Sequence, residues 1–150
     1  MKKSFVVLAL IPMFLPAVFF IPSAPSLSSQ SPHIDKTGTV ARVIDGDTIQ
    51  LSTGEKVRFV GVNAPEIHQE MEEGGPEAKS FTENLCPPGT VVYLDIDDLE
   101  PKDKYGRTLA VVYVKVGVQW INVNAELLRR GLAEILYIPP SEFNPYAWLS

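Results

Sequence analysis

The sequence has a single cysteine, so Cys86 cannot form an intramolecular disulfide bond, and we predict that it is a small buried core residue. Positive charge is also scarce, because the formal net charge is −5 at pH 7. Without Lys2 and Lys3 the chain has 11 basic and 18 acidic residues, a balance of −7. This sign excludes a protein that holds nucleic acid through a general excess of positive charge. Any phosphate binding must therefore be local.

A long apolar run occurs once, from Phe5 to Ile21, and it follows two lysines. This pattern is typical of an export signal, and a proline-rich polar stretch comes after it. We predict a signal peptide or N-terminal membrane anchor over residues 1–26 and a flexible tether over 27–36. The protein is then exported, and is either secreted or tethered to the outer face of the membrane.

The remaining residues, 37–150, are enough for one compact domain, which we expect to be monomeric. Their pattern predicts three consecutive strands, a helix with Ala78, Phe81 and Leu85 on one face, a fourth strand, a hairpin and a short helix capped by Asn124. The predicted strands cover residues 39–44, 48–51, 56–62, 91–96, 108–116 and 118–121. This order predicts a mainly β (α+β) fold built on a five-stranded OB-type barrel, a small barrel whose loops often hold oligonucleotides.

Charged residues gather on the first strands. Asp45-Gly46-Asp47 fits an ordinary tight turn, although the turn does not explain Asp47. It does not begin an EF-hand, because Lys56 stands where the twelfth-position glutamate is needed. Arg58 lies within a predicted strand, where a solvated arginine is possible but a phosphate clamp explains the guanidinium better. Glu66 at a strand end could be an ordinary exposed acid.

Two further segments carry charge. Asp103-Lys104-Tyr105-Gly106-Arg107 can be a polar turn, yet its cations and tyrosine also suit phosphate binding. His68-Gln69-Glu70 matches the H-x-E of zinc deaminases, but the partner P-C-x-x-C is absent, so we interpret residues 67–75 as a solvated acidic loop.

Several of these motifs together resemble the staphylococcal nuclease (thermonuclease) family. RVIDGDTIQL, VRFVGVNAPE, GPEAKSF, DKYGR and RRGLAEI occur in the order and spacing of that family, and the resemblance runs from about Thr39 to Tyr137. It implies an OB fold and a calcium-dependent endonuclease that hydrolyses phosphodiester bonds in DNA and RNA to leave 3′-phosphates.

The resemblance also implies roles for single residues. Asp47, Asn63 and Ala64 would hold one Ca²⁺, the last through its backbone carbonyl. The catalytic residues would be Arg58 and Arg107, which hold the scissile phosphate, and Glu66, which orients or deprotonates the attacking water. Substrate would be bound at Lys104, Tyr105 and Tyr137.

This sequence departs from the family pattern in two ways relevant to the site. Asn63 stands where the family usually has a second metal-binding aspartate, so its amide oxygen could still bind Ca²⁺ but without the charge. The loop after Glu66 is acidic where a nuclease would gain from a basic one. The alternatives to a nuclease are a non-catalytic OB-fold oligonucleotide-binding module and a tethered interaction domain.

Overall fold

The computed structural model describes residues 30–67 and 72–150. The predicted leader and the residues from His68 to Glu70 therefore lie outside the described part of the chain. Within that part, no helix combines the length and the apolar character needed to cross a membrane.

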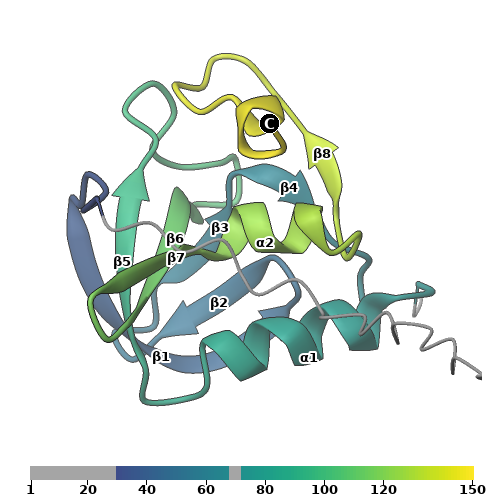
Figure 1. Cartoon of the computed structure of the whole chain (residues 1–150), viewed down its shortest axis with the longest axis horizontal. Helices are drawn as coiled ribbons and strands as arrows, with labels where there is room; N and C mark the ends of the chain where they lie inside the picture. The colour runs from purple at the N-terminus through teal and green to yellow at the C-terminus, as the bar shows by residue number, and fades with distance from the viewer. Residues whose placement is uncertain (1–29, 68–71) are drawn as a thin grey trace, which may run out of the picture.

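Five strands close into a barrel, as the sequence predicted. The main sheet runs in the order β3-β2-β1-β5-β6-β7, and parallel pairing between β3 and β6 closes it. The bounds are β1 (Lys36–Asp45), β2 (Thr48–Leu51), β3 (Lys56–Phe59), β5 (Val91–Ile96), β6 (Thr108–Val116) and β7 (Gln119–Asn122). Strands β4 (Gly61–Asn63) and β8 (Glu134–Leu136) form a separate antiparallel pair (Figure 1).

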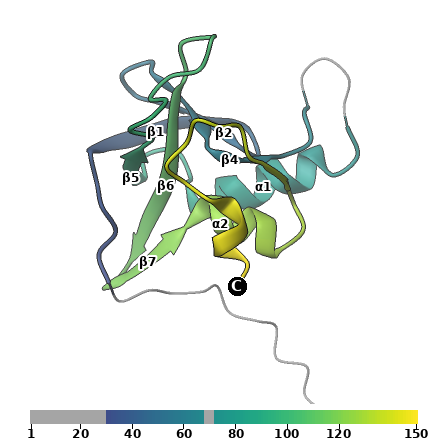
Figure 2. The ribbon, with the colours of Figure 1, turned by 90° about the horizontal axis from the view of Figure 1, so that it is seen from above.

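The helices cover the barrel and complete its core. They are α1 (Gly75–Leu85), α2 (Val123–Arg129) and the 3₁₀ helix η1 (Pro145–Trp148). Helix α1 buries Ala78 and packs Phe81 and Leu85 against the core, which confirms its predicted apolar face. Cys86 is fully buried in the same core, as predicted. Figure 2 shows α1 and α2 side by side next to the barrel.

The predicted continuous strand over residues 56–62 is wrong. The chain breaks between β3 and β4, and Gly61 adopts φ 78° at the break. A Cβ atom at Gly61 would lie 3.1 Å from both Pro145 and Trp148, so η1 packs directly on this backbone. The break turns β4 away from the barrel, where it pairs with β8.

The predicted cap of the second helix is also wrong. The N-cap of α2 is Asn122, whose side chain accepts a hydrogen bond from the backbone N–H of Ala125 at 2.9 Å. Asn124 lies inside the helix with its side chain fully buried. Its amide donates to the carbonyls of Val60 and Ala110 and accepts from Val112, so it ties α2 to β6 and to the link between β3 and β4.

The segment before β1 lies against β5. The backbone N–H of Asp35 donates to Leu94, and the Asp35 carboxylate accepts from the backbone N–H of Ile96 at 2.7 Å. His33 Nδ1 lies 3.1 Å from Asp95 Oδ1. Residues 33–36, which the sequence placed in the tether, thus contact the barrel.

Candidate active site

The Asp-Gly-Asp turn connects β1 to β2 and is supported by α1. The Thr82 hydroxyl donates to the carbonyl of Gly46 at 2.5 Å. A Cβ atom at Gly46 would approach the Cβ atoms of Ala78 and Ala64 to 2.6 and 2.9 Å, inside normal contact distance. Only glycine therefore fits at the centre of this turn. The close packing of the small residues around Gly46 positions the backbone of the next residue, Asp47.

Asp47 is buried, with a side chain only 6% exposed, and both of its oxygens have partners. Oδ1 accepts from the Thr48 hydroxyl at 2.9 Å, and Oδ2 accepts from the backbone N–H of Ala64 at 2.7 Å. Nη2 of Arg58 lies 3.2 Å from Oδ2. The carboxylate is thus held in one orientation by β2, by the residue after β4 and by a guanidinium from β3.

Most of the donors of Arg58 are used within the protein. Nη1 donates to the carbonyls of Phe59 and Val62 at 2.7 and 2.8 Å, and Nη2 donates to Asn63 Oδ1 at 3.1 Å while facing Asp47. Burial lowers the pKa of this guanidinium, and the charge of Arg107 acts in the same direction. Because an arginine has five N–H groups, the Nε–H is the one left without a partner among the described residues.

Arg107 is arranged differently. It ends the Asp103–Arg107 turn, in which the Asp103 carboxylate accepts from the backbone N–H groups of Tyr105 and Arg107 and from Arg107 Nε at 2.6 Å. Burial alone would raise the pKa of Asp103, but these hydrogen bonds lower it. Neither terminal nitrogen of Arg107 has a partner in the described part of the chain, so both prongs can receive a ligand.

The strand pairing explains why the two arginines meet. In the parallel ladder of β3 and β6, Arg58 pairs with Leu109, and β6 begins directly after Arg107. The pairing of β4 with β8 ends beside Tyr137. Sequence positions nearly eighty residues apart are thereby brought to one side of the barrel.

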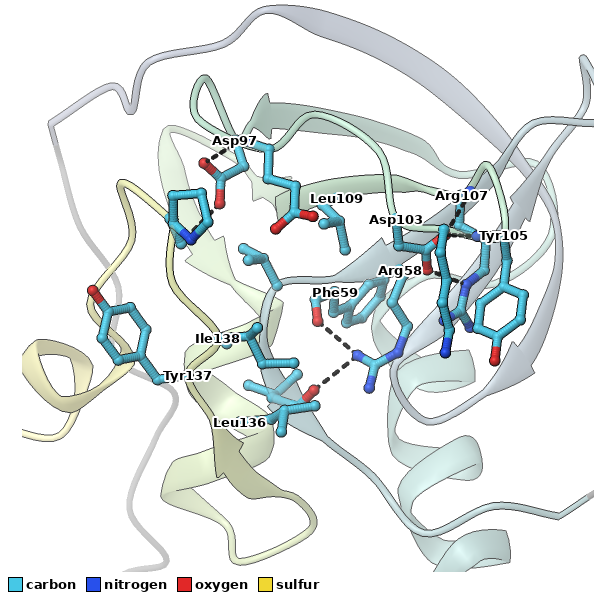
Figure 3. Close-up of a pocket in the computed structure, with 17 residues that line it drawn as sticks. Arg58, Phe59, Asp97, Asp103, Tyr105, Arg107, Leu109, Leu136, Tyr137 and Ile138 are labelled. Atoms are coloured by element: carbon cyan, nitrogen blue, oxygen red, sulfur yellow. Dashed lines mark hydrogen bonds and ion pairs between the residues drawn. The ribbon is translucent and has the colours of Figure 1, made fainter.

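A cavity of about 400 Å³ lies between these elements. Its lining includes five of the predicted site residues, namely Arg58, Lys104, Tyr105, Arg107 and Tyr137. Figure 3 shows Arg58, Tyr105 and Arg107 grouped on one side, with Leu136, Tyr137 and Ile138 on the other. The cavity therefore combines guanidinium and ammonium groups with apolar and aromatic walls, which suits a ligand with an anionic and an aromatic part.

The sequence did not identify two acids in this lining, Asp97 and Glu100. Asp97 is fully buried, and its carboxylate accepts from the Ser141 hydroxyl and from the backbone N–H of Glu142. It thus holds the segment that forms one wall of the cavity. No local pattern indicated this role, because Asp97 follows β5 like an ordinary turn residue.

Glu66 does not line the cavity. Its side chain is exposed, and its backbone N–H donates to the carboxylate of Glu72 at 2.8 Å. The described contacts join it to neither arginine. The sequence-based assignment of Glu66 to the attacking water remains a prediction.

The predicted metal ligands lie together. Asp47 Oδ2 and Asn63 Oδ1 both face the same nitrogen of Arg58, at 3.2 and 3.1 Å, and Ala64 contacts Asp47 through its backbone. Carboxylate, amide and carbonyl oxygens are the ligands that Ca²⁺ prefers, so the donor types fit this ion. The set carries one negative charge, and Arg58 lies against it.

Among the described residues, a second group with metal-binding atoms consists of His33, Asp35 and Asp95, whose ligand atoms lie within 4.8 Å of one another. It includes none of the predicted site residues and does not line the cavity.

The fold and the site define a class: a closed OB-type barrel with two arginines at a cavity beside a buried carboxylate. The family model of staphylococcal nuclease homologues matches residues 56–149. The chain belongs to the staphylococcal nuclease family.

Three relatives illustrate this membership. The chain is 41% identical to a thermonuclease of Staphylococcus intermedius, over 69% of this chain and 61% of that protein. It is 34% identical to an uncharacterized protein of Methanocaldococcus jannaschii, over 69% of this chain and 60% of the relative. It is also 34% identical to an uncharacterized endonuclease of Escherichia coli, over 80% of this chain and 71% of that protein. The chain thus spans about 60% of the length of the first two relatives.

Proposed function

We propose that this protein is a calcium-dependent endonuclease that hydrolyses phosphodiester bonds in DNA, RNA or both and leaves 3′-phosphate ends. The observation that carries the proposal is the cavity, in which Arg58 and Arg107 meet beside the held carboxylate of Asp47. Phosphodiester hydrolysis builds negative charge on the phosphorus oxygens, and preorganised cations stabilise that charge. The names of the thermonuclease and endonuclease relatives support the same reaction.

The two arginines have unequal roles in this proposal. Arg107 offers both terminal nitrogens and makes the two-pronged contact with the scissile phosphate. Arg58 contributes its Nε–H and its charge, while its other donors keep Asp47 and Asn63 in place. Glu66 accepts the proton of the attacking water, which contributes about 10²–10⁴-fold in rate. Lys104, Tyr105 and Tyr137 bind the nucleotide.

Asp47, Asn63 and the carbonyl of Ala64 would hold one Ca²⁺. When bound, this ion supplies positive charge next to the phosphate. The nearby Thr48 hydroxyl and Ala64 N–H hold Asp47 in orientation before the ion binds. Binding the ion replaces the contacts that Nη2 of Arg58 makes with Asp47 and Asn63.

We further propose that the protein acts outside the cell as a monomer, either secreted or tethered to the outer face of the membrane. The apolar segment of the sequence from Phe5 to Ile21 supports export. In this proposal residues 1–26 are the leader and the domain begins close to residue 37.

The test is digestion of plasmid and single-stranded DNA and of RNA by the purified protein, with Ca²⁺ and with chelator. We expect calcium-dependent cleavage with 3′-phosphate ends. The variant Glu66→Gln should bind nucleotide like the wild type and turn over more slowly. Binding without cleavage in the wild type under all conditions would instead favour the non-catalytic oligonucleotide-binding module.

A further inference from the structure

A second groove adjoins the Asp103–Arg107 turn. It is open, has a volume of about 650 Å³, and shares Tyr105 and Arg107 with the cavity. Its other lining residues come from the start of β1, the β2–β3 turn and the segment before β6; they are Lys36, Thr53, Gly54, Glu55, Lys56, Lys102 and Gly106. We call it the lysine groove.

The lysine groove is positive within an acidic protein. Its lining has four cations, Lys36, Lys56, Lys102 and Arg107, and one carboxylate, Glu55, a formal charge of +3, whereas the whole chain carries −5. Glu55 is already engaged by Lys36 and by the Thr108 hydroxyl. Burial alone would raise the pKa of Glu55, but these hydrogen bonds lower it, so it remains ionised at neutral pH and compensates Lys36.

The other two lysines are available. Lys56 and Lys102 are exposed, and neither forms an ion pair with a carboxylate in the described part of the chain. Lys102 contacts the Thr108 hydroxyl at 3.4 Å. By contrast, Lys79, Arg129 and Arg130 are each paired with a glutamate on their own helix. Lys56, Lys102 and Lys104 thus lie around one turn without a carboxylate partner in the described part of the chain. Two further cations of this kind lie elsewhere, because Arg42 bonds to Gln50 and Lys115 lies over the ring of Trp120.

Tyr105 connects the lysine groove to the cavity. Its side chain is 72% exposed, and Lys104 and Arg107 lie 5.1 and 5.4 Å from its ring centroid. An exposed aromatic ring between cations is a stacking platform for a base, with charges placed for the phosphates on either side.

We propose that the lysine groove binds the sugar-phosphate backbone of a single nucleic-acid strand where the strand continues beyond the nucleotide held in the cavity. This proposal rests on the proposed function, since it takes the occupant of the cavity to be a nucleotide. Lys56 and Lys102 contact successive phosphates, and Tyr105 stacks on the base between the two sites. The preferred substrate is therefore a strand of several nucleotides, not a dinucleotide.

The first experiment measures binding without cleavage. The full chain is mixed with a fluorescein-labelled 12-residue oligothymidylate in chelator, and the Kd is followed by anisotropy over a salt series. We compare wild type, the double variant Lys56→Gln/Lys102→Gln, and Lys115→Gln as a control. Lys115 is exposed and lies toward the other end of β6 from Thr108, the bridge partner of Lys102. At the usual rise per residue, about 23 Å of strand separates Lys115 from Thr108.

Loss of two phosphate contacts should lower the salt slope by about 1.4 and weaken binding at low salt on the order of tenfold. The control should stay within about twofold of the wild type. Equal binding by all three proteins would overturn the proposal. An equal loss per charge removed in the double variant and in the control would also overturn it, because it would indicate only a general charge effect. Thermal melting of each variant shows that it is folded.

The second experiment separates this proposal from the proposed function. In Ca²⁺, the double variant should raise KM for the 12-residue strand about tenfold and change kcat/KM for a dinucleotide less than twofold, because the dinucleotide does not reach the groove. If the wild type cleaves neither substrate while the double variant still loses strand binding, the endonuclease proposal fails and the lysine groove stands. If the wild type cleaves both substrates and the variant does so equally, the groove fails and the endonuclease stands.

Discussion

At the scale of single residues, the two arginines differ in how much of the guanidinium is committed to the protein. Arg58 contacts two carbonyls, an amide and a carboxylate. The Arg107 guanidinium donates only from Nε, to Asp103, and lies beside the ring of Tyr105. The sequence assigned both to the phosphate and could not separate them. Their contacts now predict different consequences of the same substitution.

We expect Arg58→Lys and Arg107→Lys each to reduce endonuclease activity by about 10²–10³-fold. At position 107 an ammonium group cannot make the two-pronged phosphate contact, and at position 58 it cannot both hold Asp47 and Asn63 and donate to the phosphate. Arg58→Lys should also destabilise the fold by about 1–3 kcal/mol, since it leaves buried acceptors unsatisfied. Arg107→Lys should cost less than about 1 kcal/mol. Activity assays and urea unfolding of both variants check this. Equal losses of stability would contradict the different roles.

With Asn63, the proposed ligand set carries one negative charge fewer than the pattern that the family resemblance implies. Asn63→Asp should therefore bind Ca²⁺ about tenfold more tightly and raise activity at limiting calcium, with a smaller gain at saturation. Without metal the variant should be less stable if the new carboxylate repels Asp47 more than Arg58 attracts it. Calcium titrations of activity and melting temperature measure both effects.

The control for this titration is Asn84→Asp, which makes the same charge change at an exposed position of α1. Its calcium dependence should match the wild type. If Asn63→Asp behaves like this control, Asn63 is not a ligand of the ion.

At the scale of elements, the sequence predicted most of the secondary structure but not its interruptions. The β-branched runs identified β2, β5 and β6 with their full extents, because alternation and turn residues are local signals. The break at Gly61 depends on η1, which lies more than eighty residues further along the chain. The three-residue strand β8 was missed for the same reason: only its pairing with β4 makes it a strand.

Gly61→Ala tests the contact between this break and η1. Both Gly61 and Gly54 have positive φ, 78° and 89°, but a Cβ atom at Gly54 would meet nothing within 4 Å. Gly54→Ala should cost about 1–2 kcal/mol from backbone strain alone. Gly61→Ala should cost about 1–3 kcal/mol more, because Pro145 and Trp148 must shift. Urea unfolding of both variants gives the difference in unfolding free energy. Equal losses of stability would show that η1 moves away from the added methyl group without a measurable cost.

The segment before β1 should be held in a pH-dependent way. The hydrogen bond to Asp95, with the charges of Asp35 and Asp98, raises the pKa of His33 above its ordinary 6.5. A raised pKa in the folded state stabilises the fold below pH 6.5, and this contribution is lost as pH rises through the raised value. The melting temperature should therefore fall from pH 6 to pH 8 more in the wild type than in His33→Gln. If the melting temperatures of the two proteins changed equally with pH, His33 would not stabilise the contact between the segment before β1 and β5.

At the scale of the whole molecule, the sequence predicted the barrel and five of the residues that line the cavity. The cavity itself could not be predicted, because it forms only when the barrel closes. Arg58 and Arg107 meet because β3 and β6 pair in parallel, and nothing in either segment specifies that register. The sequence likewise did not show that Asp97 and Glu100 line the cavity, because this depends on how the closed barrel brings distant segments together. The net negative charge of the chain, by contrast, follows from the sequence alone. Because the protein is acidic as a whole, a locally positive surface such as the lysine groove indicates a binding site for an anionic ligand.

Cys86 reports on opening of the whole core. It is fully buried, and burial raises the pKa of its thiol from 9.0 to about 12. A disulfide reagent at pH 8 should therefore react slowly with the native protein and quickly in denaturant, with a rate that follows the unfolding transition seen by tryptophan fluorescence. Fast labelling of the native protein would indicate local opening between α1 and the barrel.

The turn that carries Asp47 has a consequence for how this family can evolve. Gly46, Ala64 and Ala78 come from three separate segments and share a space that cannot admit one more methyl group at Gly46. A larger residue at Gly46 would then require a smaller residue at position 64 or 78. Across homologous sequences the side-chain volumes at these three positions should covary, so that a residue of helix α1 is inherited together with the turn that carries Asp47.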